Sequence, residues 1–272
     1  MCMRNTNKSI LRECENTLIL IEQFRKLESF LDDFNFLIFG RDNIVCRNHV
    51  FSLQRILNSA QATLGNVVEC CKCFCLADAY TLLRKYRDDL FFCLYLVTYD
   101  TTAKLSGSKH TKKMETNIEQ WCQDTLSNLN INEVLTTIGT SKWLQEAVRQ
   151  YDLQKSFARI GGQLNKYVHG NGFSFYNTNA YSFDEKNIEE QLNAIVFMAR
   201  YITTTFLFLL SLCSSHYIMS TDYIDHLEFG QTPPDGSQYW VAPFVAEYLK
   251  ANIEMIDKSC YEYLKESICM AL

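Results

Sequence analysis

The stretch QLNKYVHGNG, residues 163–172, contains the histidine whose neighbours point most directly to chemistry. If the preceding residues are helical, Asn165 and His169 lie on one face, because they are four positions apart. Gly170 suits the left-handed position that often follows a helix end. The histidine is then either a cap, favoured by the negative end of the helix dipole, or an acid–base group that works near neutral pH.

The segment LLRKYRDDLFF, residues 82–92, places charges inside an apolar helix. Arg84 and Asp88 are four positions apart and are expected to pair, and Arg87 can share the face of Arg84. Charges set among core residues need partners. Two interpretations follow. One is an intrahelical ion pair without further role. The other is a polar site in which Arg84 or Arg87 holds a phosphate and Asp88 contributes to substrate binding.

The segment KLSGSKHTKK, residues 104–113, is small, polar and basic, and we expect a loop over 101–113. Lys109 and Lys112 would contact phosphate groups if this loop takes part in a binding site, because flexible lysines bind phosphate. The alternative is a solvated loop that binds no ligand.

The residues LNKYVHG resemble the end of the signature helix of the HEPN superfamily. Members of that family are helical bundles, and many are metal-independent ribonucleases of toxin–antitoxin, CRISPR and anti-phage defence systems. Their motif reads arginine, a polar residue that is often asparagine, about three variable residues, and histidine. Asn165, His169 and Gly170 match the polar residue, the histidine and a common trailing glycine, while Leu164 stands at the arginine position.

The resemblance implies roles for these residues in RNA cleavage, in which the 2′-hydroxyl attacks its own phosphate. His169 would be the acid–base group, and Asn165 would orient the phosphate or the imidazole. An arginine would stabilise charge on the phosphoryl oxygens. Since Leu164 cannot, the resemblance implies that Arg84 or Arg87 does so, from the same chain or from a dimer partner. It also implies a homodimer and no cofactor.

The few breaks in the sequence favour long helices, because the chain has only three prolines and ten glycines. We expect one all-α domain over residues 1–272, a bundle of packed helices whose two halves are joined by the polar segment 101–114. Asp78 is an expected N-cap, and SFDE, residues 182–185, has the spacing of a capping box. The expected helices are residues 18–40, 48–71, 77–100, 118–129, 131–139, 141–151, 154–169, 182–217, 221–230 and 243–270. No segment alternates with period two.

The composition limits the setting of the protein. The net charge of −5 implies no general attraction to nucleic acid or to anionic membranes, although a local basic patch remains compatible with it. Twelve cysteines without an apolar leader at the N-terminus favour a cytoplasmic protein with reduced thiols. The run ECCKCFC, residues 69–75, has no second pair at zinc-binding spacing, so we expect buried thiols and no metal.

The segment 201–219 has no Asp, Glu, Lys or Arg, which makes it the one membrane candidate. Its apolar centre FLFLL is short, and it continues an amphipathic helix that carries Arg200. We therefore expect a buried core helix and no membrane contact.

These observations lead to two functional expectations. The first is a HEPN-like, RNA-binding protein or divergent ribonuclease of a bacterial stress or defence system. The second is a non-catalytic helical module that binds another protein. The negative charge, the incomplete motif and the abundant aromatic residues favour the second, and FGQTPPDGSQYW, residues 229–240, would be its recognition loop.

Overall fold

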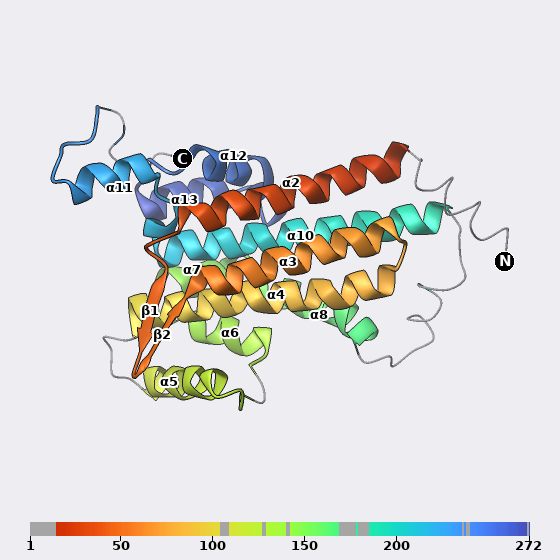
Figure 1. The fold of residues 1–272 in the computed structure, drawn as a ribbon, viewed down its shortest axis with the longest axis horizontal. Coiled ribbons are helices and arrows are strands. Elements are labelled where there is room, and N and C mark those ends of the chain that lie inside the picture. The colour runs from red at the N-terminus through yellow and green to blue at the C-terminus, as the bar shows by residue number, and fades with distance from the viewer. Residues whose placement is uncertain are drawn as a thin grey trace.

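The computed structural model of the chain describes residues 15–103, 109–126, 129–139, 142–168, 178, 185–235, 237, 240–270 and 272. Over these residues the protein is a bundle of packed helices with one small two-stranded sheet, so the predicted all-α fold class is confirmed. Four long helices form its body: α2 (Glu15–Leu37), α3 (Leu53–Lys72), α4 (Leu76–Thr98) and α10 (Glu185–Cys213) (Figure 1). The shorter helices are α5 (Lys109–Cys122), α6 (Ile131–Ile138), α7 (Lys142–Gln150), α8 (Leu153–Val168), α11 (Thr221–Glu228), α12 (Pro243–Asn252) and α13 (Cys260–Ile268).

Helix α4 lies at the centre of the bundle and contacts α3, α10, α8 and α6. Its apolar residues recur around most of the helix, as expected for an element covered on several sides, and Leu83, Leu90 and Leu94 are fully buried. The buried hydroxyl of Tyr86 is satisfied by Thr203 of α10, 2.5 Å away. A buried polar group of this kind is costly without a partner, so the pair fixes how α4 meets α10.

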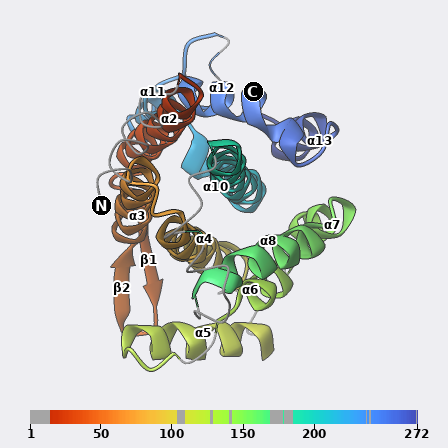
Figure 2. The same ribbon diagram turned by 90° about the vertical axis from the view of Figure 1, so that its right-hand side faces the viewer.

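Helices α4 and α8 run antiparallel along the lower side of the bundle (Figure 2). Tyr80, near the start of α4, stacks on Tyr167 at the end of α8, while Phe91 contacts Phe157 near the start of α8, with ring centroids 4.6 Å apart. The stretch of α4 between these two contacts therefore faces the middle of α8.

A β-hairpin precedes α3, where the sequence predicted a helix from about Asn48. Strands β1 (Asn43–Cys46) and β2 (His49–Ser52) pair antiparallel, with Cys46 opposite His49, and α3 begins only at Leu53. The prediction was wrong because a side chain outside the hairpin fixes the start of the helix: the Asp42 carboxylate accepts hydrogen bonds from the Ser52 hydroxyl and from the backbone N–H of Gln54.

Other helix boundaries also differ from the prediction. Asp78 lies in the first turn of α4, and Cys75 occupies the N-cap position. The helix expected to reach residue 217 ends at Cys213, followed by a 3-10 turn over Ser215–Ile218. The last helix, expected over 243–270, is broken into α12 and α13 by a second 3-10 turn, Ile253–Met255, and by the bend that follows it.

The segment between α4 and α5 is shorter than the expected loop. A π-helical turn, Tyr99–Ala103, continues α4, and α5 begins at Lys109, so the lysines at 109–113 are helical. The Ser182–Glu185 capping box lies outside the described residues except for Glu185.

Helix α10 is the one described helix that is long and apolar enough to cross a membrane by length and composition. Within Asn187–Cys213, an 18-residue window has a mean hydropathy of 1.8, and 83% of that window is buried inside the bundle. Its burial matches the core helix expected from the sequence.

Candidate functional site

The carboxylate of Asp88 on α4 receives two arginines. Oδ1 accepts hydrogen bonds from Nε and Nη2 of Arg87, at 2.9 and 2.6 Å, and Oδ2 lies 3.7 Å from Nε of Arg84. The intrahelical pair expected between Arg84 and Asp88 is therefore present. Two guanidinium groups against one carboxylate leave a net positive charge on this part of α4.

Each of these arginines also keeps one nitrogen without an acceptor. The Nη1 atoms of Arg84 and Arg87 are buried and have no hydrogen-bond partner in the part of the chain that the structure describes. Arg87 is only 4% exposed. A buried cationic donor without an acceptor carries a desolvation penalty, which an incoming anion would remove. Phosphate oxygens match the geometry of a guanidinium group.

Helix α8 approaches Arg87 closely. A Cβ added to Gly161 would lie 3.3 Å from Arg87 Nη1, so the absence of a side chain at this position admits the guanidinium group. One turn later Leu164, the position of the arginine in the HEPN motif, is fully buried in the core. An arginine there would place its charge among the apolar side chains of the core.

Asn165 lies on α8 and is exposed, next to the stripe of α8 that packs on α4. Val168 is the last residue of the helix. His169 and Gly170 lie outside the described residues, so their predicted roles stay predictions. Arg87 of α4 thus lies against α8 at Gly161. Asn165 and Val168, the last described residue before His169, lie on the same helix, beside the contact between α4 and α8. We call this contact the seam of α4 and α8.

The two predicted lysines lie elsewhere. Lys109 and Lys112 are exposed on α5, which runs antiparallel to α4: Asn117 donates to the hydroxyl of Tyr95, and the ring of Trp121 contacts that of Phe92. Both lysines therefore lie beyond the Tyr95 end of this contact, more than about 16 Å from Arg84 along the helix axis. The structure does not bring them to the arginine cluster.

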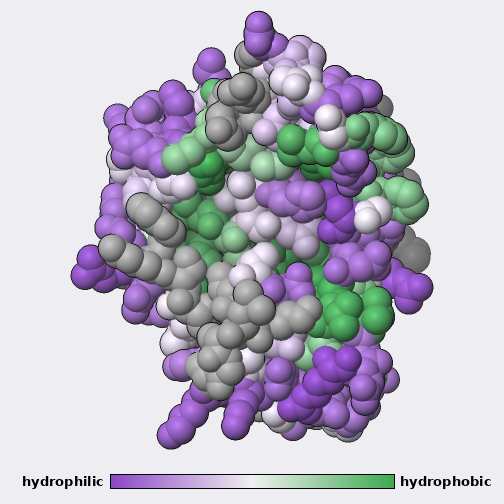
Figure 3. Space-filling model, turned by 90° about the vertical axis from the view of Figure 1, so that its left-hand side faces the viewer, coloured by the Kyte–Doolittle hydropathy of each residue, from purple (hydrophilic) through white to green (hydrophobic). Residues whose placement is uncertain are grey.

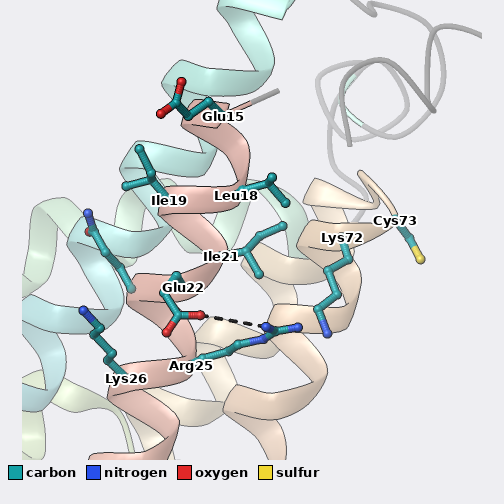
Figure 4. Close-up of a pocket in the computed structure, with 10 residues that line it drawn as sticks. Glu15, Leu18, Ile19, Ile21, Glu22, Arg25, Lys26, Lys72 and Cys73 are labelled. Carbon is teal, nitrogen blue, oxygen red and sulfur yellow. Dashed lines mark ion pairs between the residues drawn. The ribbon is translucent and has the colours of Figure 1, made fainter. Parts of the chain in front are cut away.

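A pocket of about 940 Å³, lined by the first half of α2 and the end of α3, lies at the end of the bundle where α8 also terminates (Figures 1 and 4). Arg25, Lys26 and Lys72 line it, and Arg25 pairs with Glu22 at 3.8 Å. Leu18 and Ile19 are about half exposed beside these charges. This surface was not predicted from the sequence, although Leu18 and Ile19, two apolar residues outside the buried stripe of α2, were a usable signal.

The cysteine run at the end of α3 does not form a ligand set. Cys71 is fully buried, and burial raises the pKa of its thiol. Cys73 and Cys75 lie beyond the last residue of the helix, so these thiols do not share one helical face. No cluster of three or more metal-ligating side chains occurs among the described residues.

No protein-family model, no curated protein and no solved structure matches this chain. The candidate site is therefore defined by the geometry of α4 and α8 alone.

Proposed function

We propose that this protein binds RNA at the seam of α4 and α8, as a HEPN-like helical protein of a bacterial stress or defence system. One observation supports the proposal above the others: Arg84 and Arg87 are oriented by the same carboxylate, and each has a buried Nη1 that finds no acceptor among the described residues. A phosphate of the RNA backbone would supply that acceptor.

The setting of the two arginines suits an anion holder. Asp88 fixes both guanidinium groups, which lowers the conformational entropy lost when a phosphate binds. The nearby end of the bundle adds Arg25, Lys26 and Lys72, against the carboxylates of Glu15 and Glu22. Arg25 pairs with Glu22 and Lys72 pairs with Glu69, so this end of the bundle carries mixed charges, on a protein whose net charge is −5.

Cleavage on this proposal follows the route implied by the resemblance. The 2′-hydroxyl loses its proton and attacks the adjacent phosphorus, the bond to the 5′-oxygen breaks, and that oxygen gains a proton, which leaves a cyclic phosphate. His169 moves the proton, and Asn165 orients the phosphate or the imidazole. Arg84 and Arg87 stabilise charge on the phosphoryl oxygens, within one chain or across a homodimer.

The first test is binding of a fluorescently labelled single-stranded RNA to the full chain, measured by fluorescence anisotropy at several salt concentrations. Arg84→Ala should weaken binding about tenfold, or ~1.4 kcal/mol. It should also reduce the salt slope by about 0.7 for the lost phosphate contact. Arg87→Lys keeps the charge of the buried site but loses the paired N–H donors of the planar guanidinium group, so it should weaken binding similarly.

The matched control is Arg55→Ala, which removes the same charge from an exposed position on α3. Its binding should stay close to that of the unmodified protein. Equal affinities of the Arg84, Arg87 and Arg55 variants would refute the proposed phosphate site.

The second test is RNA cleavage in the presence of EDTA. Alanine substitution of His169, Arg84 or Arg87 should each abolish cleavage. Full activity in all three variants would end the catalytic part of the proposal, whereas RNA binding that depends on Arg84 without any cleavage would leave a non-catalytic RNA-binding protein.

A second candidate function, binding of another protein, is favoured by a separate observation. Phe36, Phe39 and Phe229 are 83%, 69% and 76% exposed around the ends of α2 and α11. Figure 3 shows apolar patches that interrupt the hydrophilic surface at this end of the molecule. Large exposed aromatic side chains of this kind are typical of protein interaction surfaces.

A further inference from the structure

A second large pocket lies far from the arginine cluster along the bundle, where α2 ends and α11 and α12 begin (Figure 1). It has a volume of about 820 Å³. Asp32, Asp33 and Phe36 of α2 line one side, and Phe36 lies next to both aspartates on the helix surface, four positions after Asp32 and three after Asp33. Asp222 and Phe244, from the first turns of α11 and α12, line the other side.

A chain of hydrogen bonds in the wall of this pocket ends in an acceptor that has no donor. The Asp32 carboxylate can only accept, so Gln61 donates to it through Nε2, at 3.1 Å. That orients Gln61 Oε1 toward Asn35, which donates through Nδ2 at 3.2 Å. Asn35 is 4% exposed, and its Oδ1 is buried without a hydrogen-bond partner among the described residues. The hydrogen-bond network of Asp32, Gln61 and Asn35 is fully satisfied only when a donor reaches this oxygen.

The charge of the pocket favours a cation. Three aspartates line it, and the described lining residues include no lysine, arginine or histidine. Neither Asp33 nor Asp222 forms an ion pair with the described residues through its carboxylate. The positive ends of the α11 and α12 dipoles lie at this pocket but do not cancel its negative charge. Asp222 lies in the first turn of α11, and α12 begins with Pro243, which has no backbone N–H to donate.

The aromatic rings distinguish between the two cationic side chains. Phe36 is 83% exposed at the rim, and Phe244 is held in place by the ring of Phe30, with centroids 5.7 Å apart. A guanidinium group is planar, weakly hydrated and stacks on aromatic faces, and it carries five N–H donors for the carboxylates and the amide oxygen. An ammonium group is compact and strongly hydrated, and it fits such a pocket less well.

We propose that this pocket binds the guanidinium group of an arginine presented by a segment of a partner protein. The arginine pairs with Asp33 and Asp222. Residues flanking the arginine pack on the exposed Phe36, and on Phe39 and Phe229 beyond the pocket. RNA is excluded as the occupant, because a phosphate would meet three carboxylates.

The test is an anisotropy titration of the full chain with a short labelled peptide in which one arginine stands between leucines. Two matched peptides carry lysine or citrulline, the neutral isostere of arginine, at the same position. The arginine peptide should bind with a Kd below about 1 mM. The lysine and citrulline peptides should bind at least about fivefold more weakly. Lysine lacks the paired N–H donors of the planar guanidinium group, and citrulline lacks the positive charge.

Asp33→Asn and Asp222→Asn should each weaken binding of the arginine peptide about fivefold to tenfold. Both residues are exposed, so the substitution leaves the core intact. The control is Asp124→Asn, the same change at an exposed site after α5, and it should leave binding unchanged. Equal binding of the three peptides, no detectable binding, or indifference to both aspartate substitutions would overturn the proposal. Self-association of the chain that both substitutions abolish would assign the pocket to a second copy and would overturn the partner assignment.

Discussion

Tyr80 of α4 and Tyr167 of α8 stack face to face, with ring centroids 4.4 Å apart and ring planes 10° apart. Burial, with a smaller contribution from Tyr167, raises the pKa of the Tyr80 phenol, so the Tyr80 ring stays neutral at physiological pH. Tyr167 lies two positions before His169. The stacked pair therefore holds the last turn of α8, and the chain that leads to the candidate catalytic histidine, against α4.

A double-mutant cycle measures this contact. Tyr80→Leu and Tyr167→Leu should each lower the free energy of unfolding, and the coupling energy between them should be about 0.5–1.5 kcal/mol, as for other aromatic pairs. Urea denaturation of the two single variants and the double variant gives the value. Strict additivity would show that the stack does not hold the two helices together.

The adjacent glycines of α8 make a matched comparison. Alanine at an exposed helical glycine stabilises by about 0.5–1 kcal/mol. Gly162→Ala should show this gain, because no described atom beyond its own stretch of helix lies within 4 Å of its added Cβ. Gly161→Ala should show none or a loss, since its Cβ would press on Arg87 Nη1 at 3.3 Å. Thermal denaturation compares the two, and equal gains would show that Arg87 does not sit against Gly161.

Restoring the HEPN arginine should fail. Leu164→Arg places a charge at a fully buried position and should destabilise the fold by about 3 kcal/mol or more. Asn165→Arg, one residue later and exposed, adds the same charge and should leave the free energy of unfolding nearly unchanged. A stable Leu164→Arg protein with new RNA-cleaving activity would contradict the buried packing of this position.

The bend before α13 should make stability depend on pH. The Asp257 carboxylate accepts hydrogen bonds from the backbone N–H and the hydroxyl of Ser259, at 2.8 and 2.7 Å, and these hold its pKa below the usual value. Its contribution is present above the unfolded-state pKa, about 3.9, and is lost as the pH falls through the folded-state pKa.

Asp257→Asn should therefore be less stable than the unmodified protein near neutral pH, and the difference should vanish at low pH. Melting temperatures recorded from neutral pH down to about pH 2.5 test this. The exposed Asp124→Asn variant is the control, and a difference that is independent of pH would show that the carboxylate charge plays no part.

The fold class was predictable because helical periodicity runs through long segments, as in α4, where Leu83, Leu90 and Leu94 recur on the buried face. The hairpin before α3 was not, because each strand has only four residues and alternation over so short a stretch has no clear period. The hydrogen bonds from Ser52 and Gln54 to Asp42 end the hairpin, and they form between residues ten and twelve positions apart. They depend on how the chain folds back on itself, so no local pattern predicts them.

The candidate sites divide in the same way. The Arg84–Asp88 pair follows from i,i+4 spacing and was predicted. The burial of Arg87 against Gly161 depends on how α8 packs on α4, which spacing within one helix cannot give. The acidic pocket joins Asp33 to Asp222 across most of the chain, so no local pattern marks it.

Helices α3 and α4 share the most extensive contact between any two described elements, and only a short connection, residues 73–75, separates them. Contacts between neighbours in sequence cost little loop-closure entropy, so we expect this helical hairpin to form early in folding. Pulsed hydrogen exchange should find its amides protected before those of α10. A growing chain that has emerged as far as Thr98 would then already carry the face on which α8 and α10 later assemble.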